Sequence, residues 1–347
     1  MKICYFGIYN PDFSRNKIFQ KGLRGNGVEI IDCRDDSVGL MKFVRLFVKH
    51  RKIKDDYDVL IVGYPGQLVV PLAKSISRKK VVFDSLCPLY DGEIASRQAV
   101  GLLSFKRLKV FLIDFFAYSF ADLILLETTA QIEFVAKKYW VKKTKCLRVF
   151  TGVDDTEFFR EGAKSPSDKF TVFFRGQFLP EAGVDTILRA AKILEKQDIN
   201  FIIMGGNFLK QEITALAESL QLKNTKIIDG FLSFEQIRQL MSQAQVCLGQ
   251  FGKNERLERT IPHKAFETLA SGLPYITGSA GGVSELLTDG KNCLMSKLSD
   301  PADLADKIMI LKNNPALAKK IADNGYNLYQ QKLNPKYLAA EIIKAIE

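Results

Sequence analysis

Two charged side chains in the stretch from residue 256 to residue 287 have the types and spacing needed to bind a nucleotide sugar. Lys264 lies in the first turn of an expected helix, where the helix dipole disfavours a cation unless an anion is bound there. Helix N-termini bind phosphate readily, and Glu267 projects from the same side of the helix three residues later. A cation for phosphate beside a carboxylate for sugar hydroxyls suits such a ligand. The alternative is a solvated Lys–Glu pair on an ordinary surface helix.

The elements that must hold these side chains are expected to be a helix, a short strand and a glycine loop. Pro262 suits a first helical turn, and Thr260 is the expected cap ahead of it. Gly272 is expected to end the helix. A strand is predicted over residues 275–277, and the glycine-rich residues 278–282 then lead into a second helix.

Strands and helices are expected to alternate along both halves of the chain. The apolar run at residues 57–63 predicts a buried parallel strand, and apolar residues recur with helical spacing from residue 184 to residue 194. The polar residues 161–169 predict a joint between domains. Two successive series of strand–helix repeats predict an α/β protein with two Rossmann-like domains.

The residues from Glu267 to Pro274, followed by Gly281, Gly282 and Glu285, resemble a signature of retaining glycosyltransferases of family 4, E-A-x-A-x-G-x-P…G-G-x-x-E. Many enzymes of that family build bacterial polysaccharide and lipopolysaccharide. They have the GT-B fold, in which two Rossmann-like domains face a cleft and the last helix packs back on the first domain. The resemblance implies that Glu267 holds the ribose hydroxyls of the donor. It also implies that the loop carrying Gly281, Gly282 and Glu285 closes over the donor.

The same resemblance divides the chain into three parts. Residues 151–159 are similar to the N-G-V-D-x-x-x-F linker between the two domains of the family, with Thr151 in place of the usual Asn. We therefore expect an N-terminal acceptor-binding domain at residues 1–155 and a donor-binding domain at residues 165–330. The remaining residues, 331–347, are expected to form the helix that returns to the first domain.

The basic residues that bind diphosphate differ from the family pattern. The family's G-R-L-x-x-x-K-G motif places an Arg and a Lys on the diphosphate, where this chain has Gln177 and Ala182. The leaving diphosphate still needs cations, because stabilising its developing charge is most of the catalytic task. Arg175 and Lys264 are the expected catalytic substitutes, although Arg175 at a strand end is equally suited to a structural ion pair. Arg259, where the family often has a Glu that contacts the donor sugar, is the third candidate.

Three further residues complete the candidate donor and catalytic groups. Gly176 and Gly205, each at the end of a predicted strand, are expected to bind the donor. The family tends to place a His from the first domain near the donor sugar, and this chain offers Asp84 at the corresponding strand end. Asp84 is therefore a candidate polar contact to sugar or acceptor, and the alternative is that it caps the following segment.

The first β–α turn, at residues 7–16, lacks the G-x-G-x-x-G pattern of dinucleotide-binding proteins, which argues against a dehydrogenase. In enzymes with the GT-B fold this turn receives acceptor and diphosphate. The resemblance therefore makes Asn10, Arg15 and Asn16 the candidate acceptor-binding residues.

The net charge of +11 is distributed unevenly along the chain. Residues 1–150 hold 26 Lys and Arg against 15 Asp and Glu, whereas the remainder holds 24 of each. A basic domain suggests an anionic partner, either nucleic acid or a membrane. Nucleic acid is not expected, because no recognised binding motif is present. The basic residues 42–54, with Phe and Leu between them, are the expected contact with anionic lipid, at about 1 kcal/mol for each charge. The alternative is a solvated helix face.

A very apolar helix is predicted at residues 110–120. Asp114 interrupts it, and the run is too short to span a bilayer. We expect this helix to lie in the protein core, with a position at the membrane interface as the alternative.

The counts of cysteine and histidine bear on compartment and cofactors. Six cysteines without a C-x-x-C pair and only two histidines predict reduced thiols and no metal site. The first residues lead directly into a strand and show no secretory signal. We therefore predict a cytoplasmic enzyme, with peripheral attachment to the inner face of the membrane as an extension of that hypothesis.

The predicted activity is transfer of a sugar, with retention, from a UDP- or GDP-sugar to a glycan or a lipid-linked acceptor. No metal or cofactor is expected to take part. The first alternative is a catalytically inactive binding or scaffold subunit with the same fold. The second is a nucleic-acid-binding protein, which the charge alone suggests.

Overall fold

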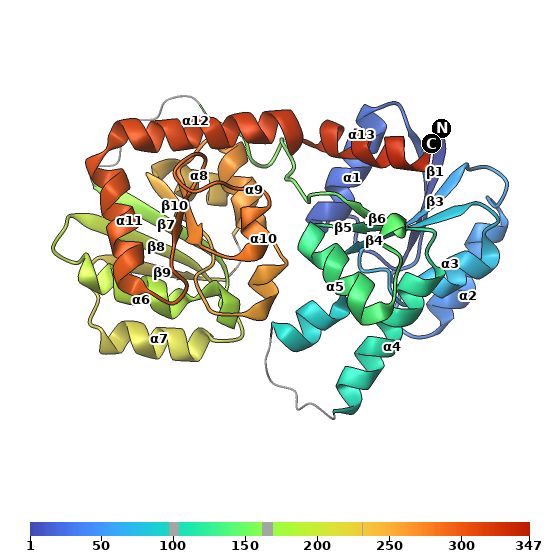
Figure 1. Ribbon diagram of the computed structural model, residues 1–347, viewed down its shortest axis with the longest axis horizontal. Coiled ribbons are helices and arrows are strands. Elements are labelled where there is room, and N and C mark those ends of the chain that lie inside the picture. The colour runs from blue at the N-terminus through green and yellow to red at the C-terminus, as the bar shows by residue number, and fades with distance from the viewer. Residues whose placement is uncertain (97–103, 162–168, 231) are drawn as a thin grey trace. The chain divides into compact units, whose positions relative to one another are not determined.

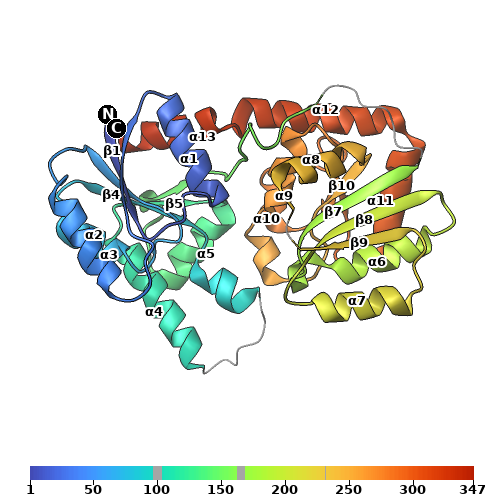
Figure 2. The same cartoon turned by 180° about the vertical axis from the view of Figure 1, so that it is seen from behind.

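The computed structural model describes residues 1–96, 104–161, 169–230 and 232–347 and divides into two compact units (Figures 1 and 2). Unit 1 comprises Met1–Asp154 and Lys332–Glu347, and unit 2 comprises Asp155–Gln331. Each unit has its own core of buried aliphatic and aromatic side chains packed between a parallel sheet and its helices.

The sheet of unit 1 has six parallel strands in the order β2-β1-β3-β4-β5-β6. Its central strands are almost entirely apolar because helices cover both faces. The strands are β1 (Lys2–Gly7), β2 (Glu29–Arg34), β3 (Val59–Val62), β4 (Lys80–Leu86), β5 (Leu123–Leu126) and β6 (Cys146–Arg148).

Right-handed crossovers decide which face of this sheet each helix covers. From β2 onward the chain advances through the sheet in one direction, so the four helices after β2 share one face, and the helix between β1 and β2 lies on the other. Along the shared face, each of these four helices contacts the next. They are α2 (Met41–Arg51), α3 (Val70–Ile76), α4 (Phe105–Phe120) and α5 (Thr129–Tyr139), and the opposite face carries α1 (Ser14–Gly25) and α13 (Pro335–Ile346).

Unit 2 repeats this architecture with strands in the order β12-β11-β10-β7-β8-β9, all parallel. Its longest pairing joins β7 to β8 over eight residues. The strands are β7 (Phe170–Gln177), β8 (Ile199–Gly206), β9 (Thr225–Asp229), β10 (Val246–Leu248), β11 (Tyr275–Gly278) and β12 (Leu294–Ser296).

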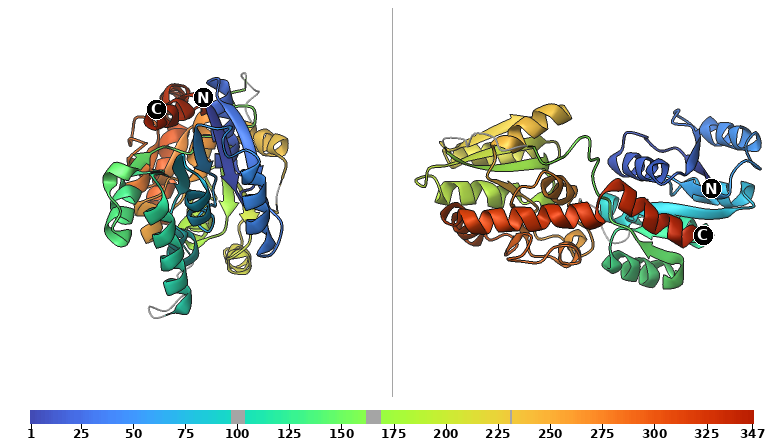
Figure 3. Two further views of the ribbon diagram at one scale, coloured as in Figure 1. Left: turned by 90° about the vertical axis from the view of Figure 1, so that its right-hand side faces the viewer. Right: turned by 90° about the horizontal axis from the view of Figure 1, so that it is seen from above.

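Helices connect the strands of unit 2, and α11 and α12 follow its last strand. The long α12 lies along unit 2 in Figure 3. The helices are α6 (Val184–Ile193), α7 (Lys210–Ser219), α8 (Phe234–Gln243), α9 (His263–Ala270), α10 (Gly281–Ser284), α11 (Pro301–Asn313) and α12 (Pro315–Lys332).

The predicted α/β class, the two Rossmann-like halves and the returning C-terminal helix are confirmed. Predictions of where two helices begin are wrong. The helix expected at residues 110–120 begins at Phe105, because the Ser104 side chain caps it by accepting from the Lys106 N–H. Pro262 is the N-cap residue of α9 and not part of its first turn, and the Thr260 hydroxyl donates to the Arg256 carbonyl instead of capping this helix.

No helix in the described ranges is both long enough and apolar enough to cross a bilayer.

The last helix is held against α1 by a glycine. A Cβ atom on Gly22 would lie 2.0 Å from the Pro335 carbonyl oxygen and 2.9 Å from the Cβ of Ala339. The Asn26 side chain also donates to the Lys336 carbonyl. The absence of a side chain at residue 22 therefore lets the two helices approach backbone to backbone.

Gly22→Ala is expected to lower the free energy of unfolding of unit 1 by about 1–3 kcal/mol, because α13 must move to admit the methyl group. Gly25→Ala is the matched control: no atom lies within 4 Å of its added Cβ, and alanine favours the helix. Denaturant unfolding of both variants measures the difference. Equal effects at the two positions would show that the close approach at Gly22 is unimportant.

Candidate active site

The carboxyl ends of the parallel strands in unit 2 meet at one edge of the sheet, where α/β proteins commonly bind ligands. Arg175 and Gly176 lie near the end of β7, and Gly205 lies beside them near the end of β8. Helix α9 brings Lys264 and Glu267 to Arg175. The structure therefore brings the predicted catalytic cations of the second half together with the predicted ribose-binding carboxylate.

Glu267 is the centre of this cluster. Its buried carboxylate is paired with the Arg175 guanidinium and accepts a hydrogen bond at 3.0 Å from Nδ1 of His263. Burial opposes ionisation, but Arg175 and His263 outweigh it and hold the pKa of Glu267 well below its usual range. Glu267 is therefore ionised at neutral pH and can accept hydrogen bonds from hydroxyl groups.

Lys264 is the cation of this cluster that pairs with no carboxylate in the described part of the chain. No carboxylate or hydrogen-bond acceptor among the described residues contacts its ammonium, which lies 5.1 Å from the centre of the Phe174 ring. Burial lowers the pKa of Lys264 from its ordinary value of 10.5 to about 8, with Glu267 opposing the shift and Arg175 adding to it. A bound anion would supply the missing partner and raise that pKa again.

A second ion pair lies close enough to influence Lys264. The Glu181 carboxylate is fully buried and pairs at 2.6 Å with Arg256. Glu181 belongs to the turn just after β7, one residue before the Ala182 that replaces the family's Lys. Arg259, the third predicted cation, is largely buried with its guanidinium 3.7 Å from the Glu255 carboxylate.

The two glycines at the strand ends allow close approach: Gly176 leaves room for Lys264, and Gly205 lets β8 lie close to β7. A Cβ on Gly176 would lie 3.1 Å from the Lys264 ammonium nitrogen. A Cβ on Gly205 would lie 1.9 Å from the Gly176 carbonyl oxygen on the neighbouring strand. Both residues have positive φ angles, which glycine adopts without strain. Side chains at these positions would therefore displace Lys264 or separate the strands.

The sequence predicted Gly281 and Gly282 in a loop ahead of a helix, but they are the first two residues of α10, and they pack on the segment that precedes α9. The Gly281 N–H donates to the Glu258 carboxylate at 3.0 Å, and a Cβ on Gly282 would lie 2.5 Å from the Thr260 carbonyl oxygen. Glu285 directly follows α10 and is partly exposed. In the structure these glycines allow close backbone packing, and their predicted contact with a donor stays a prediction.

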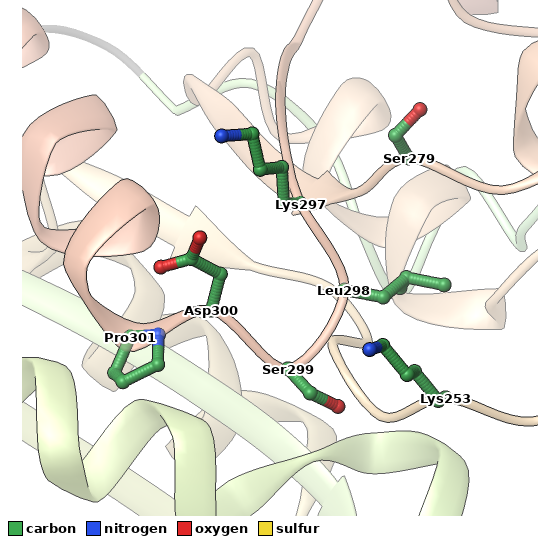
Figure 4. A pocket seen from close by; sticks show the side chains of 7 residues that line it. All are labelled: Lys253, Ser279, Lys297, Leu298, Ser299, Asp300 and Pro301. Atoms are coloured by element: carbon green, nitrogen blue, oxygen red, sulfur yellow. The ribbon is translucent and has the colours of Figure 1, made fainter.

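An open cavity of ≈ 540 Å³ with a mixed polar and apolar lining lies on the same edge, beside the ends of β11 and β12 (Figure 4). Its lining includes Lys253, Ser279, Lys297 and Asp300, and Ser279 lies in the glycine-rich stretch two residues before α10 begins. Its volume is in the range of small-molecule sites. Its lining does not include Arg175, Lys264 or Glu267.

The candidate residues of the first half lie in unit 1. Asp84 near the end of β4 and Arg15 in the first turn of α1 form a fully buried ion pair at 2.7 Å. Burial raises the pKa of Asp84, and Arg15 partly offsets this. Arg15 also donates to the Val149 carbonyl and the Thr151 hydroxyl. The pair ties three chain segments together inside unit 1, and its predicted role at sugar or acceptor stays a prediction.

Asn16 and Asn10 hold the first β–α turn. The buried Asn16 amide donates to the carbonyls of Asn10 and Tyr64, and its oxygen accepts from the Tyr64 N–H and the Tyr5 hydroxyl. Asn10 is exposed, and its side chain accepts from the Asp12 N–H. Of the three predicted acceptor-binding residues, Asn10 alone presents an exposed surface, while Arg15 and Asn16 fix the turn that carries it.

Sequence reasoning missed His263, Glu181 and Arg256. The contact of His263 with Glu267 could have been predicted, because side chains four residues apart on a helix lie next to each other. The pairing of the other two could not, since 75 residues separate Glu181 from Arg256.

Solved structures with a similar fold cover nearly the whole chain. Anabaena HepE in complex with UDP and glucose matches with a TM-score of 0.72 at 16% identity, covering 99% of this chain and 98% of that one. Sucrose-phosphate synthase from Thermosynechococcus elongatus matches with a TM-score of 0.75 at 14% identity, covering 99% and 97%. The fold is therefore that of the GT-B glycosyltransferases.

The chain belongs to the family of glycosyl transferases group 1, whose sequence model matches residues 155–328, half of the chain. An uncharacterised glycosyltransferase of Methanocaldococcus jannaschii is 28% identical over 183 residues, covering 53% of this chain and 48% of that protein. The lipopolysaccharide core biosynthesis glycosyltransferase LpsD of Rhizobium meliloti is 23% identical over 177 residues, covering 51% and 49%. The chain thus spans about half the length of these relatives.

Lys264→Met is expected to stabilise the free protein at pH 7 by ~1–3 kcal/mol, because it removes a partly buried charge that has no partner among the described residues. Between pH 8 and 10.5 the folded wild type binds fewer protons at Lys264 than the unfolded chain does. Wild-type stability should therefore rise with pH across this window, and the variant should lack that rise. Denaturant unfolding from pH 7 to pH 10.5 measures both effects.

Lys253→Met is the control, since Lys253 is an exposed lysine on the same edge of the sheet. It should change stability by less than about 0.5 kcal/mol and leave the wild-type rise in place. A Lys264→Met variant that is less stable than wild type at pH 7 would contradict the assignment of an uncompensated charge.

Proposed function

We propose that this protein is a retaining glycosyltransferase of family 4. It moves a sugar from a UDP- or GDP-sugar to a glycan or lipid-linked acceptor during synthesis of a cell-envelope polysaccharide or glycolipid. One observation carries the proposal: the ionised Glu267, its partner Arg175 and the unpartnered Lys264 share the carboxyl edge of the sheet in unit 2. The signature from Glu267 to Glu285 and the membership of the group 1 family support it.

Each group in the cluster has a defined task in this reaction. Glu267 accepts hydrogen bonds from the ribose hydroxyls, and Arg175 keeps it ionised and oriented. Lys264 and Arg175 face the diphosphate, whose negative charge grows as the bond between sugar C1 and the phosphate oxygen breaks. The acceptor oxygen forms its bond to C1 on the same face and passes its proton to the departing phosphate oxygen. These cations neutralise the leaving group, so the proposal includes no metal or cofactor.

The nature of the donor and acceptor is supported by relatives. HepE was solved with UDP and glucose, and LpsD is named for lipopolysaccharide core synthesis. Unit 1 holds 29 Lys and Arg against 18 Asp and Glu, a net charge of +11, whereas unit 2 holds 21 of each. A basic unit suits peripheral attachment to an anionic membrane, and we propose a location on the cytoplasmic face, where lipid-linked acceptors are extended.

The alternative is a binding or scaffold subunit that has lost catalysis. It is favoured by Gln177 and Ala182, which stand where the family has its diphosphate-binding Arg and Lys. Lys264 and Arg175 argue against it, because an uncompensated ammonium is costly to keep unless it serves a ligand.

The proposed function predicts first that one nucleoside diphosphate binds at Glu267. At a concentration one hundred times its dissociation constant, UDP or GDP should raise the melting temperature by about 5–10 °C. Glu267→Ala should abolish the shift, because the ribose hydroxyls lose their acceptor. Thermal unfolding with UDP, GDP, ADP and CMP identifies the base.

The control is Glu195→Ala. It removes a carboxylate at the end of α6 that pairs with Lys192, on the opposite edge of the sheet from Glu267. This variant should keep the full shift. If no nucleotide stabilises the wild type, the proposed donor site is refuted, and only the assignment of the fold and the family stands.

The second prediction concerns turnover and stereochemistry. Arg175→Ala should lower kcat by about 10²–10³-fold, since it removes a donor that acts on the leaving diphosphate. Slow hydrolysis of the matching sugar nucleotide, followed by NMR, measures kcat and shows the anomer first released. Release of the anomer present in the donor supports retention, and the opposite anomer contradicts it. Tight nucleotide binding without any hydrolysis or transfer would favour the scaffold subunit.

A further inference from the structure

Helix α4 of unit 1 presents an apolar surface to solvent. Its outward side chains follow one another at intervals of three or four residues, so they form one stripe along the helix. They are 41% to 80% exposed, although most large apolar side chains of this chain lie in its cores. The stripe consists of Phe105, Leu108, Leu112, Phe116 and Phe120.

This stripe is additional to the face with which α4 packs on unit 1. The packed face carries Val110, Asp114, Ala117 and Tyr118, all buried. Asp114 accepts hydrogen bonds from the Tyr139 hydroxyl and from the N–H groups of two residues after β4. The helix is therefore anchored by one face and apolar on the other, which is uncommon for a helix that faces only water.

Trp140 extends the stripe sideways. It follows α5, is 75% exposed and lies with its ring 6.3 Å from the rings of both Phe111 and Phe115. It is the single tryptophan of the chain. Tryptophan favours the boundary between hydrocarbon and water, because its ring is apolar and its N–H is polar. We call Trp140 and the α4 stripe together the α4 face.

Exposed lysines that contact no described carboxylate lie around the α4 face. Lys109 lies on the stripe itself, and Lys137 and Lys142 flank Trp140; all three are exposed, and none contacts a carboxylate within the described ranges. The two nearby carboxylates, Glu93 and Glu133, are each paired with a lysine. Apolar side chains among uncompensated lysines match a surface that combines hydrocarbon with negative charge.

Helix α2, which the sequence suggested as the membrane contact, fits less well. It also exposes apolar side chains, including Val44 and Val48. However, its Arg45 and Lys49 both pair with the Asp35 carboxylate, and part of its positive charge is thereby compensated inside unit 1.

We propose that the α4 face is the surface by which this protein docks on an anionic bilayer. The aromatic and aliphatic side chains enter the headgroup boundary, and the lysines contact the phosphate groups. Helix α4 follows β4 and so begins at the carboxyl edge of the sheet, where Phe105 is the most exposed residue of the stripe. Docking would therefore present that edge to lipid-linked molecules. This inference rests on the proposed function and names the surface by which the protein would attach to the membrane.

The single tryptophan allows a direct test without nucleotide. Wild-type protein is mixed with vesicles of phosphatidylcholine alone or with 30% phosphatidylglycerol, on the order of a typical anionic membrane content. On the anionic vesicles we expect co-sedimentation, a shift of Trp140 emission to shorter wavelength and quenching by lipids with brominated chains. Vesicles of phosphatidylcholine alone should bind at least about tenfold more weakly.

Two matched double variants locate the surface. Leu112→Glu with Phe116→Glu alters the α4 face, and Val44→Glu with Val48→Glu alters α2; all four side chains are about half exposed, and each pair lowers the net charge by two. The α4 pair should weaken binding at least about tenfold relative to the α2 pair, because it also removes apolar contact. Circular dichroism melts check that both variants fold.

Several outcomes would overturn the inference. They are no binding by the wild type, equal losses in the two variants, or a stronger loss in the α2 pair. An emission shift that depends on protein concentration and not on vesicles would mark the α4 face as a contact between two copies. Nucleotide binding is measured separately in buffer, so failure of membrane docking and failure of the donor site are distinguishable.

Discussion

The charge balance around Glu267 is the constraint on which the candidate site depends. Five neighbouring groups form this cluster, with two carboxylates, Glu181 and Glu267, against three cations, Arg175, Arg256 and Lys264. Two cations are paired, and Lys264 remains as an excess positive charge in a partly desolvated place. A bound diphosphate would balance this excess charge. Its negative charge would stabilise the Lys264 ammonium in place of the water that burial removes.

The two cations nearest Glu267 come from different elements of unit 2. The family motif has an Arg and a Lys at the positions of Gln177, the last residue of β7, and Ala182, in the turn that follows. Here Arg175 comes from the end of β7 and Lys264 from α9, two elements that meet at one edge because all strands are parallel. Gly176 leaves room for Lys264, since a Cβ there would lie 3.1 Å from the Lys264 ammonium nitrogen.

More of the candidate site could be predicted from the sequence in unit 2 than in unit 1. Glu267 and Lys264 were recognisable because both lie in one short helix, and Arg175 because it borders a strand. The partnership of Arg175 with Glu267 was not predictable, since 92 residues separate them. In unit 1, Arg15 was a candidate acceptor-binding residue and Asp84 a candidate contact to sugar or acceptor, but folding buries them as an ion pair. Only the contact between α1 and β4 could reveal this pair, since 69 residues separate the two side chains.

The amino-acid sequence by itself determined the alternation of strands and helices, the two-domain class and the uneven charge, because these follow from local periodicity and composition. The tertiary structure alone decided which side of each apolar segment meets water. Helix α4 was expected in the core from its composition, but a helix that is apolar all round can bury only the side that finds a neighbour. The rest of α4 stays exposed, since the structure places no other element over the stripe from Phe105 to Phe120 in the described ranges.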